Sequence, residues 1–179
     1  IKQYSYNPPN LYLINFPCGF TNKICFSNDK ENEMRTLYPE IFNHFDKFKN
    51  NKSSKSKGLL KRDDQGDYWW ELRSCVYSDV FNGQVIAWQR ITQKNTFCIT
   101  KPGTVVLDSM AFLSDTKDKT NYLLGFLNSS LVYYWMRKNV HEYGASGFRL
   151  SNQYVKEIIV PTDKVLINTI DTIMKNNHD

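Results

Sequence analysis

The chain has 179 residues, of which 41% are hydrophobic and 23% charged, and its formal net charge is +5. This length is enough to bury one substantial core, and no stretch approaches the roughly 18 apolar residues that span a membrane. The first ten residues, IKQYSYNPPN, lack the apolar segment of a signal peptide. Composition therefore favours a soluble, cytoplasmic protein and argues against secreted and membrane-spanning classes.

Residues 1–35 are expected to form short strands or a linker from a preceding domain. Two apolar runs, 11–16 (LYLINF) and 23–27 (KICFS), are bounded by turn-forming and polar residues, which is typical of strands. The sequence NPP at residues 7–9 is the start of a motif that grips the target base in DNA amino-methyltransferases. Asn10 follows where that motif has an aromatic residue to stack on a flipped base, so a plain turn is the favoured interpretation.

A basic segment follows an amphipathic helix predicted for residues 36–51 (TLYPEIFNHFDKFKNN), in which Pro39 can occupy the first turn. From Lys47 to Arg62 the chain has seven basic residues and no acidic residue. The rest of the chain keeps 16 of the 23 basic residues and all 18 acidic residues, a net charge of −2. Such a segment suits the phosphates of a polyanion, because each phosphate contact releases counterions. The alternative is a solvated loop.

Next to the basic segment lies an aromatic cluster, within the stretch RDDQGDYWWELRSC at 62–75. We expect Trp70 and Leu72 to lie in the core and to fix the base of the basic loop. Tyr68 or Trp69 could instead stack on a nucleic-acid base.

Neither a catalytic residue nor a metal site is predicted. A metal-dependent nuclease needs converging acids with a lysine nearby, but Leu-Arg follows Glu71 where acid-x-Lys would end. The acids of this stretch are expected to cap turns or to form ion pairs; they are Asp63, Asp64, Asp67 and Glu71. The four cysteines show no CxxC spacing and no histidine at metal spacing, and are expected to be buried free thiols; they are Cys18, Cys25, Cys75 and Cys98.

Strands are predicted in succession at 83–92 (GQVIAWQRIT), 96–100 (TFCIT) and within 103–114 (GTVVLDSMAFLS). Their connections are too short for crossover helices, so the sheet should be mostly antiparallel. The strongest helical pattern, 118–140, has an apolar face wide enough to pack on that sheet.

The remainder is expected to hold a glycine-bearing loop at 141–150, a short helix after Ser151, a strand at 157–161 and a helix capped by Asp163. The predicted class is therefore α+β, with a mostly antiparallel β-sheet packed against a few helices.

Five segments between residues 38 and 161, taken in order, resemble the TaqI-like C-terminal specificity domain of type IIG restriction-modification enzymes and related adenine-specific DNA methyltransferases. They are YPEIFNHFDKFK, KRDDQGDYWWELRSC, QVIAWQRIT, YLLGFLNSSLVYYW and FRLSNQYVKEIIVP. One departure is Val85-Ile86 where the family often has Lys-Ile, so that a phosphate-binding lysine is missing or replaced by Arg90.

The resemblance implies a non-catalytic DNA target-recognition domain over residues 36–162, followed by a C-terminal helix at 163–179. The chain would then be a fragment of a longer polypeptide. Its partners would be double-stranded DNA and the methyltransferase or nuclease domains of that polypeptide. S-adenosylmethionine and Mg would be bound only by those missing domains, and this chain would need no cofactor.

Such a domain needs cations on phosphates and forked or amide side chains on base edges. The predicted phosphate contacts are Lys52, Lys55, Lys57, Lys61, Arg62, Lys94 and Lys101. The predicted base contacts are Gln65, Arg90, Gln93, Arg149 and Asn152, because arginine can hold guanine and an amide can hold adenine. Arg149, beside the loop GASGF, is the first choice. The alternatives are a protein-interaction module that docks onto a partner enzyme, and a metal-dependent nuclease.

Overall fold

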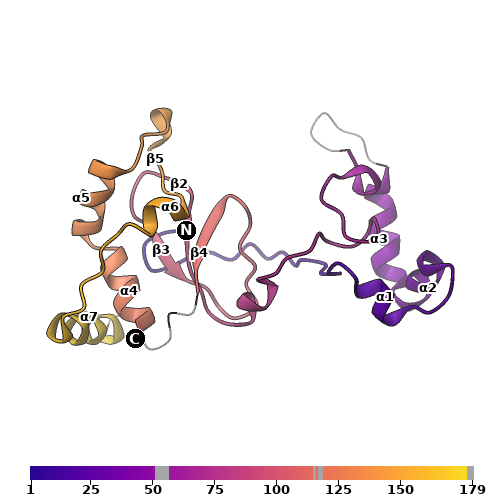
Figure 1. The fold of residues 1–179 in the computed structure, drawn as a ribbon, viewed down its shortest axis with the longest axis horizontal. Helices are drawn as coiled ribbons and strands as arrows, with labels where there is room; N and C mark the ends of the chain where they lie inside the picture. Colours follow the sequence, from indigo (N-terminus) through magenta and orange to yellow (C-terminus); the bar gives the residue numbers. More distant parts are fainter. Residues whose placement is uncertain (51–56, 115, 117–118, 177–179) are drawn as a thin grey trace. The chain divides into compact units, whose positions relative to one another are not determined.

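The computed structural model describes every residue except 51–56, 115, 117–118 and 177–179. The chain forms two compact units: a helical unit, Tyr12–Val76, and a sheet unit made of Ile1–Leu11 and Tyr77–Asp179 (Figure 1). These bounds differ from the predicted domains, whose first boundary, between residues 35 and 36, falls inside helix α2 (Lys30–Leu37). Within the described part of the chain, no helix combines the length and the apolar character that a membrane crossing requires.

The helical unit contains α1 (Phe20–Ile24), α2, α3 (Pro39–Lys49) and the 3-10 turn η1 (Leu59–Lys61). The predicted helix at 36–51 is confirmed as α3, and Pro39 occupies its first turn. The preceding helix α2 was not predicted. Its N-terminus is capped by Asp29, whose side chain accepts a hydrogen bond from Asn32 N.

The two strands predicted in the first 35 residues are wrong. Residues 11–16 have no regular structure, and of the second run Lys23 and Ile24 belong to helix α1 while residues 25–27 form no strand. Leu11 and Tyr12 are 81% and 92% exposed, so this apolar run does not form the buried face of a strand. Phe16 alone of this run is buried, and its carbonyl accepts a hydrogen bond from Leu72 N.

The aromatic cluster at 68–70 belongs to the core of the helical unit. Trp70 is 4% exposed and its Nε1 donates to Thr21 Oγ1 (2.9 Å), so its predicted core position is confirmed. Trp69 is also buried, and its Nε1 donates to Glu31 Oε2 (3.1 Å). Both indoles pack edge-to-face against Phe42 of α3. Trp69 therefore lies in the core, and the alternative that it stacks on a nucleic-acid base is wrong.

The sheet unit has a three-stranded antiparallel sheet in the order β3-β1-β4, formed by β1 (Ile86–Gln89), β3 (Phe97–Ile99) and β4 (Met110–Leu113). Ile86 of β1 faces Ile99 on one side and Leu113 on the other. A separate antiparallel pair joins β2 (Ile91–Thr92) to β5 (Phe148–Arg149). The α+β class and the antiparallel pairing are confirmed, although the segment 83–92 supplies two strands instead of one.

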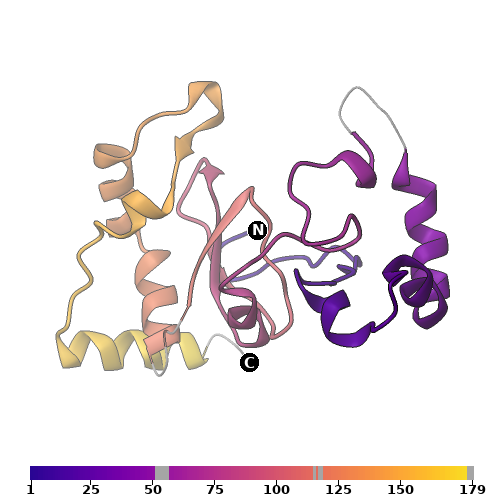
Figure 2. The same ribbon diagram turned by 45° about the vertical axis from the view of Figure 1, so that its right-hand side comes forward.

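The predicted helix at 118–140 is two helices, α4 (Thr120–Leu127) and α5 (Ser130–Asn139). The break is made by Asn128, whose side chain accepts from Phe97 N and donates to Phe97 O, both at 3.0 Å. Ser129 then caps α5 by accepting from Val132 N. Asn128 thus continues the hydrogen bonding of β3 and ties the junction of the two helices to the sheet. Figures 1 and 2 show the helices of this unit beside its strands.

After β5 the chain forms the short helix α6 (Asn152–Val155) and the final helix α7 (Lys164–Asn176). Both were predicted, and the Asp163 cap is confirmed by a 2.9 Å bond from Leu166 N. Helix α7 packs closely on α4, because a Cβ placed on Gly125 would lie only 2.7 Å from Ile170 Cγ2. The strand predicted at 157–161 is wrong: this segment pairs with no strand among the described residues, and Ile159 is 87% exposed.

Candidate nucleic-acid interface

The β2–β5 pair is held against the sheet unit by a buried anchor. Trp88 of β1 is 2% exposed and its Nε1 donates to the carbonyl of Leu150, the residue that follows β5 (2.9 Å). Within β5 itself, Phe148 packs against the core of the sheet unit. Because side chains alternate along a strand, Arg149 points away from that core, and it is exposed.

The glycine loop before β5 makes a close approach that no other residue could reproduce. Gly147 has φ 108°, and a Cβ there would lie 2.5 Å from Thr92 O and 2.9 Å from Gln93 Cα. The absence of a side chain at Gly147 therefore lets the 141–147 loop lie directly against the turn that follows β2.

This pairing gathers four of the predicted DNA contacts. Ile91 lies opposite Arg149, so the ribbon places Arg90, Gln93 and Lys94 of the β2 segment beside Arg149, which is distant in sequence. Gln93, Lys94 and Arg149 are exposed, and no described residue pairs with their side chains. Arg90 is engaged, because its Nη1 lies 3.1 Å from Asp108 Oδ1 and 3.0 Å from the Asp108 carbonyl. That ion pair is exposed and contributes little stability.

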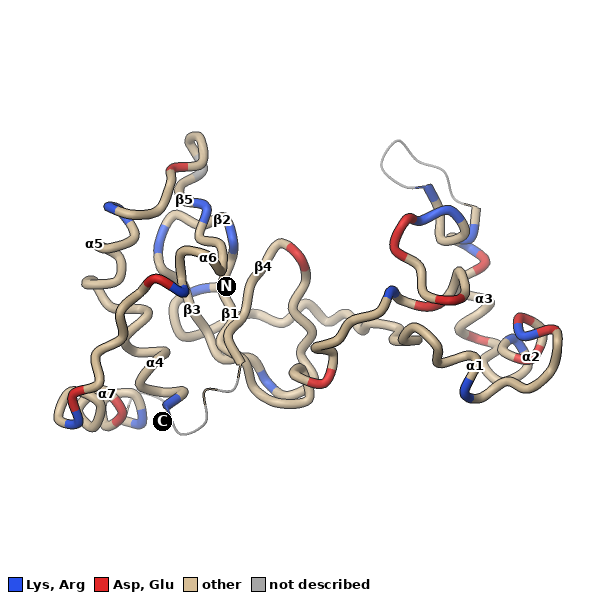
Figure 3. The backbone as a smooth tube through the Cα atoms, in the orientation of Figure 1, with Lys and Arg blue, Asp and Glu red and all other residues tan. Residues whose placement is uncertain are grey.

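Positive charge gathers around the same ribbon. Residues 90–94 and 137–149 contain five basic residues and one acidic residue, Glu142. Figure 3 shows Lys and Arg positions at β2, at β5 and at the end of α5 in this part of the sheet unit. Arg137 and Lys138, in the last turn of α5, lie within four residues of the 141–147 loop.

Two predicted contacts of the sheet unit occupy other positions. Lys94 precedes β3, whereas Lys101 follows it, at the other end of the strand. Lys101 is exposed, and its backbone N–H donates to Tyr6 Oη (3.0 Å). Asn152 is exposed in the first turn of α6, three residues after Arg149. Asn152 therefore lies near the ribbon in the chain, whereas Lys101 belongs to a separate turn.

The other six predicted contacts belong to the helical unit. Lys52 and Lys55 lie outside the described residues. Lys57 forms an exposed ion pair with Asp63 (2.7 Å), and Lys61 is exposed at the end of η1. Arg62 is half-buried, and its Nη2 donates to the Glu71 carbonyl.

Gln65, predicted to read a base, is engaged inside the loop instead. Its Nε2 donates to the carbonyls of Leu59 (3.1 Å) and Leu60 (2.8 Å), and its backbone bridges to Leu72. The amide nitrogen of Gln65 is therefore used in hydrogen bonds that stabilise the 58–72 loop. With Arg62, Gln65 thus has a structural role in this structure.

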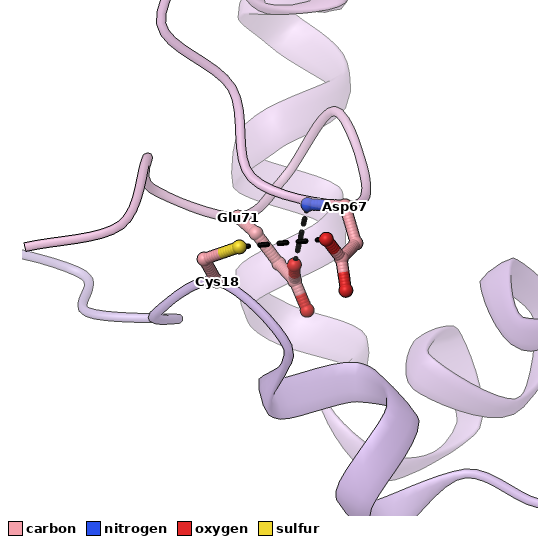
Figure 4. A group of neighbouring side chains, drawn as sticks. All are labelled: Cys18, Asp67 and Glu71. Carbon is pink, nitrogen blue, oxygen red and sulfur yellow. Dashed lines mark hydrogen bonds between the residues drawn. The ribbon is translucent and has the colours of Figure 1, made fainter.

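The nearest arrangement to a metal centre is the group Cys18, Asp67 and Glu71, whose ligand atoms lie within 4.8 Å of one another (Figure 4). Glu71 is fully buried, and its carboxylate accepts three backbone N–H bonds, from Gly19 (3.0 Å), Thr21 (2.8 Å) and Asp67 (3.0 Å). The hydrogen bond from Cys18 to Asp67 raises the pKa of that thiol, so it disfavours the thiolate that would bind a metal ion. A protonated thiol and a carboxylate whose oxygens already accept backbone N–H bonds are poor metal ligands. We therefore interpret the group as a structural lock, meaning a set of hydrogen bonds that joins residues 18–21 to residues 66–71.

The prediction that these acids cap turns or form ion pairs is confirmed for Glu71, which accepts backbone N–H bonds, and for Asp63, which pairs with Lys57. What it missed is the partner, because Gly19 and Thr21 are some 50 positions away in the chain. The four cysteines are free, as expected, but only Cys25 and Cys98 are buried, and Cys75 is exposed.

A second engaged cluster joins α2 to α3. Arg35 contacts Glu31 and Asp46, each at 2.7 Å, and Lys49 contacts Glu31 at 2.9 Å. Burial opposes ionisation of Glu31, but hydrogen bonds from Arg35, Lys49 and Trp69 outweigh it and lower the pKa of that carboxyl. The hydrogen bond from Arg35 likewise lowers the pKa of Asp46. Lys49 also lies over the Trp69 ring, 4.6 Å from its centroid, so this basic residue is used within the fold.

Comparison with known proteins adds no assignment: no protein-family model matches the chain, and no curated protein matches it. The functional interpretation therefore depends on the sequence resemblance and on the side chains that the structure leaves unpaired.

Proposed function

We propose that this chain is a non-catalytic DNA sequence-recognition domain that serves an adenine-specific methyltransferase or a type IIG restriction-modification enzyme. The proposal combines the ordered resemblance over residues 38–161 with the chemistry of the β2–β5 ribbon. Catalysis, with S-adenosylmethionine and Mg, would belong to other domains of the same polypeptide.

The observation that carries the proposal is the pairing of Ile91 with Arg149. It brings Arg149, Gln93 and Lys94, whose side chains pair with no described residue, onto one exposed ribbon from two segments that are far apart in the chain. A two-stranded β-ribbon fits the major groove of B-form DNA, where each base pair has its own pattern of donors and acceptors. Free polar groups on such an element are available to a ligand, since no competing internal bond must first be broken.

The roles divide by chemistry. The Arg149 guanidinium can donate two parallel bonds to guanine N7 and O6, and the Gln93 amide can pair with adenine N6 and N7. Lys94 can contact a phosphate beside them, which sets register without reading sequence. Lys57 and Lys61 of the helical unit stay predicted phosphate contacts, and Lys57 would have to leave its ion pair with Asp63.

The test is a titration of the chain against labelled duplex DNA pools at several salt concentrations, followed by selection of preferred sequences. Arg149→Ala should weaken binding to the selected site by about 1–3 kcal/mol and relax one position, whereas Lys94→Ala should weaken all sequences alike and lower the salt slope by roughly 1. Lys164→Ala, which removes an exposed lysine at the start of α7, is the matched control and should change neither.

Absence of salt-dependent binding by the wild-type chain would contradict the proposal. It would favour instead the module that docks onto a partner enzyme. Cleavage or methyl transfer by the 179-residue chain would contradict its non-catalytic part.

A further inference from the structure

A third extended segment lies beside β5, on the side opposite β2. Glu142 forms an antiparallel bridge with Phe148. Tyr143 N donates to Gly147 O (2.6 Å), and Arg149 N donates to His141 O (3.2 Å). Because β5 also pairs with β2, residues 148–149 form the middle of three antiparallel segments, 91–92, 148–149 and 141–142.

Residues directly opposite one another across antiparallel strands share a face. Thr92 and Phe148 share the inner face: Thr92 is 7% exposed, and Phe148 packs on the core. Ile91, Arg149 and His141 share the outer face: Ile91 is 45% exposed, and the other two are also exposed. The outer face therefore places an exposed aliphatic side chain directly beside an unpaired guanidinium.

The His141 end of this face is fixed, because its ring packs edge-to-face on Tyr154 of α6 with 5.9 Å between centroids. The Ile91 end is open. An isoleucine there gains nothing from phosphates, and the apolar group that the major groove offers is the 5-methyl group of thymine. Directly opposed side chains lie about 4.5–5.5 Å apart at Cβ, while successive base pairs are roughly 3.4 Å apart. The two side chains can thus reach neighbouring base pairs.

We propose that this outer face reads a guanine with Arg149 and, in a neighbouring base pair, the 5-methyl group of a thymine with Ile91. The inference depends on the proposed function and narrows it to a base step. The surrounding charge favours duplex DNA over an apolar protein partner at this face. Residues 90–94 and 137–149 hold five basic residues against Glu142, and the excess stays positive when Asp108, the ion-pair partner of Arg90, is included.

The experiment uses duplexes that the wild-type chain selects from a random pool. Each thymine of the selected site is replaced in turn by deoxyuridine, which lacks only the methyl group, and binding is measured by fluorescence anisotropy. One replacement, next to a guanine, should weaken wild-type binding about four-fold, the effect of losing one buried methyl group. Ile91→Ala should bind the thymine and uracil forms equally, and Arg149→Lys should lose the preference for that guanine while keeping its salt dependence.

Ile159→Ala is the matched control, because Ile159 is an 87% exposed isoleucine of the same unit; it should retain the four-fold difference. Circular dichroism checks that each variant is folded. Should Ile91→Ala lose its cooperative unfolding transition, Ile91→Thr keeps a β-branched side chain in β2 and should still reduce the difference.

The possible failures are distinguishable. If the wild-type chain shows no salt-dependent duplex binding, the proposed function is wrong and this inference falls with it. If the chain selects a site but no uracil replacement weakens binding, or if the Ile91 variants still discriminate against uracil, the inference about the base step is overturned while DNA recognition stands.

Discussion

The polar side chains predicted to contact DNA are used differently in the two units. In the helical unit, Glu71, Gln65 and Arg62 all bond to backbone groups, and Glu31 lies in an ion-pair network. In the sheet unit, Gln93, Lys94 and Arg149 are exposed, and their side chains have no partner within the described part of the chain. The richest run of charge in the sequence is therefore partly a structural device, whereas a sparser set on the β2–β5 ribbon is free to bind. Charge density alone does not distinguish these uses, but hydrogen-bond partners do.

The largest expected effect that separates the units comes from Glu71→Gln. The substitution replaces one carboxylate oxygen by an NH₂ group facing backbone donors, in a position that is fully buried. We expect a loss of about 3–5 kcal/mol from the free energy of unfolding of the helical unit. Hydrogen exchange should accelerate at the Gly19, Thr21 and Asp67 amides and not in β1. Asp64→Asn, at an exposed acid of the same stretch, is the control; equal losses from both variants would refute the lock.

A smaller effect, on the sheet unit alone, is expected from Gly147→Ala. The added Cβ meets Thr92 O and requires a left-handed backbone, which costs about 1–3 kcal/mol or displaces the loop. DNA affinity should fall, because Arg149 is moved relative to Gln93. Gly103→Ala also has positive φ, but a Cβ there has nothing within 4 Å, so it controls for backbone strain without the close approach. If both variants lose equal DNA affinity in titrations, the ribbon contact is not responsible.

Trp69→Phe should lower the free energy of unfolding of the helical unit by about 1 kcal/mol, because it removes the hydrogen bond from Nε1 to Glu31. Chemical unfolding measures that loss. DNA affinity should be unchanged at temperatures where the variant is folded, since Trp69 is buried. A weakened affinity with unaltered stability would restore the interpretation of Trp69 as a stacking platform and would erase the contrast between the two units.

The smallest effect is a pH dependence confined to the helical unit. The pKa values of Glu31 and Asp46 are lowered in the folded state. Their contribution to stability is therefore complete above the unfolded-state values, about pH 4, and is lost as the pH falls through the lower folded-state values. Amide exchange in α2 and α3 should rise in that range before exchange in β1 does. Arg35→Met removes the shared partner and should flatten this dependence; an unchanged acid profile would show that the ion pairs do not contribute.

Elements whose signals are local could be predicted from the amino-acid sequence. Helix α3 with Pro39 in its first turn, helix α7 with its Asp163 cap, and the core position of Trp70 follow from spacing and from neighbours a few residues away. Such signals fail where apolar residues are exposed, as at Leu11 and Ile159.

Features that depend on partners distant in the chain could not be predicted in this way. Asn128 divides a continuous helical pattern because it bonds to Phe97, and the segment 83–92 is divided because β2 pairs with β5 instead of continuing the sheet. Glu71 holds two distant segments together because its carboxylate accepts hydrogen bonds from the backbone N–H groups of Gly19 and Thr21. Arg149 lies opposite Ile91 because of the register between β2 and β5, which no local sequence pattern encodes. Periodicity and capping depend on short-range sterics and hydrogen bonds. Whether a polar side chain is consumed by the fold or left for a ligand depends on which remote backbone groups pack beside it.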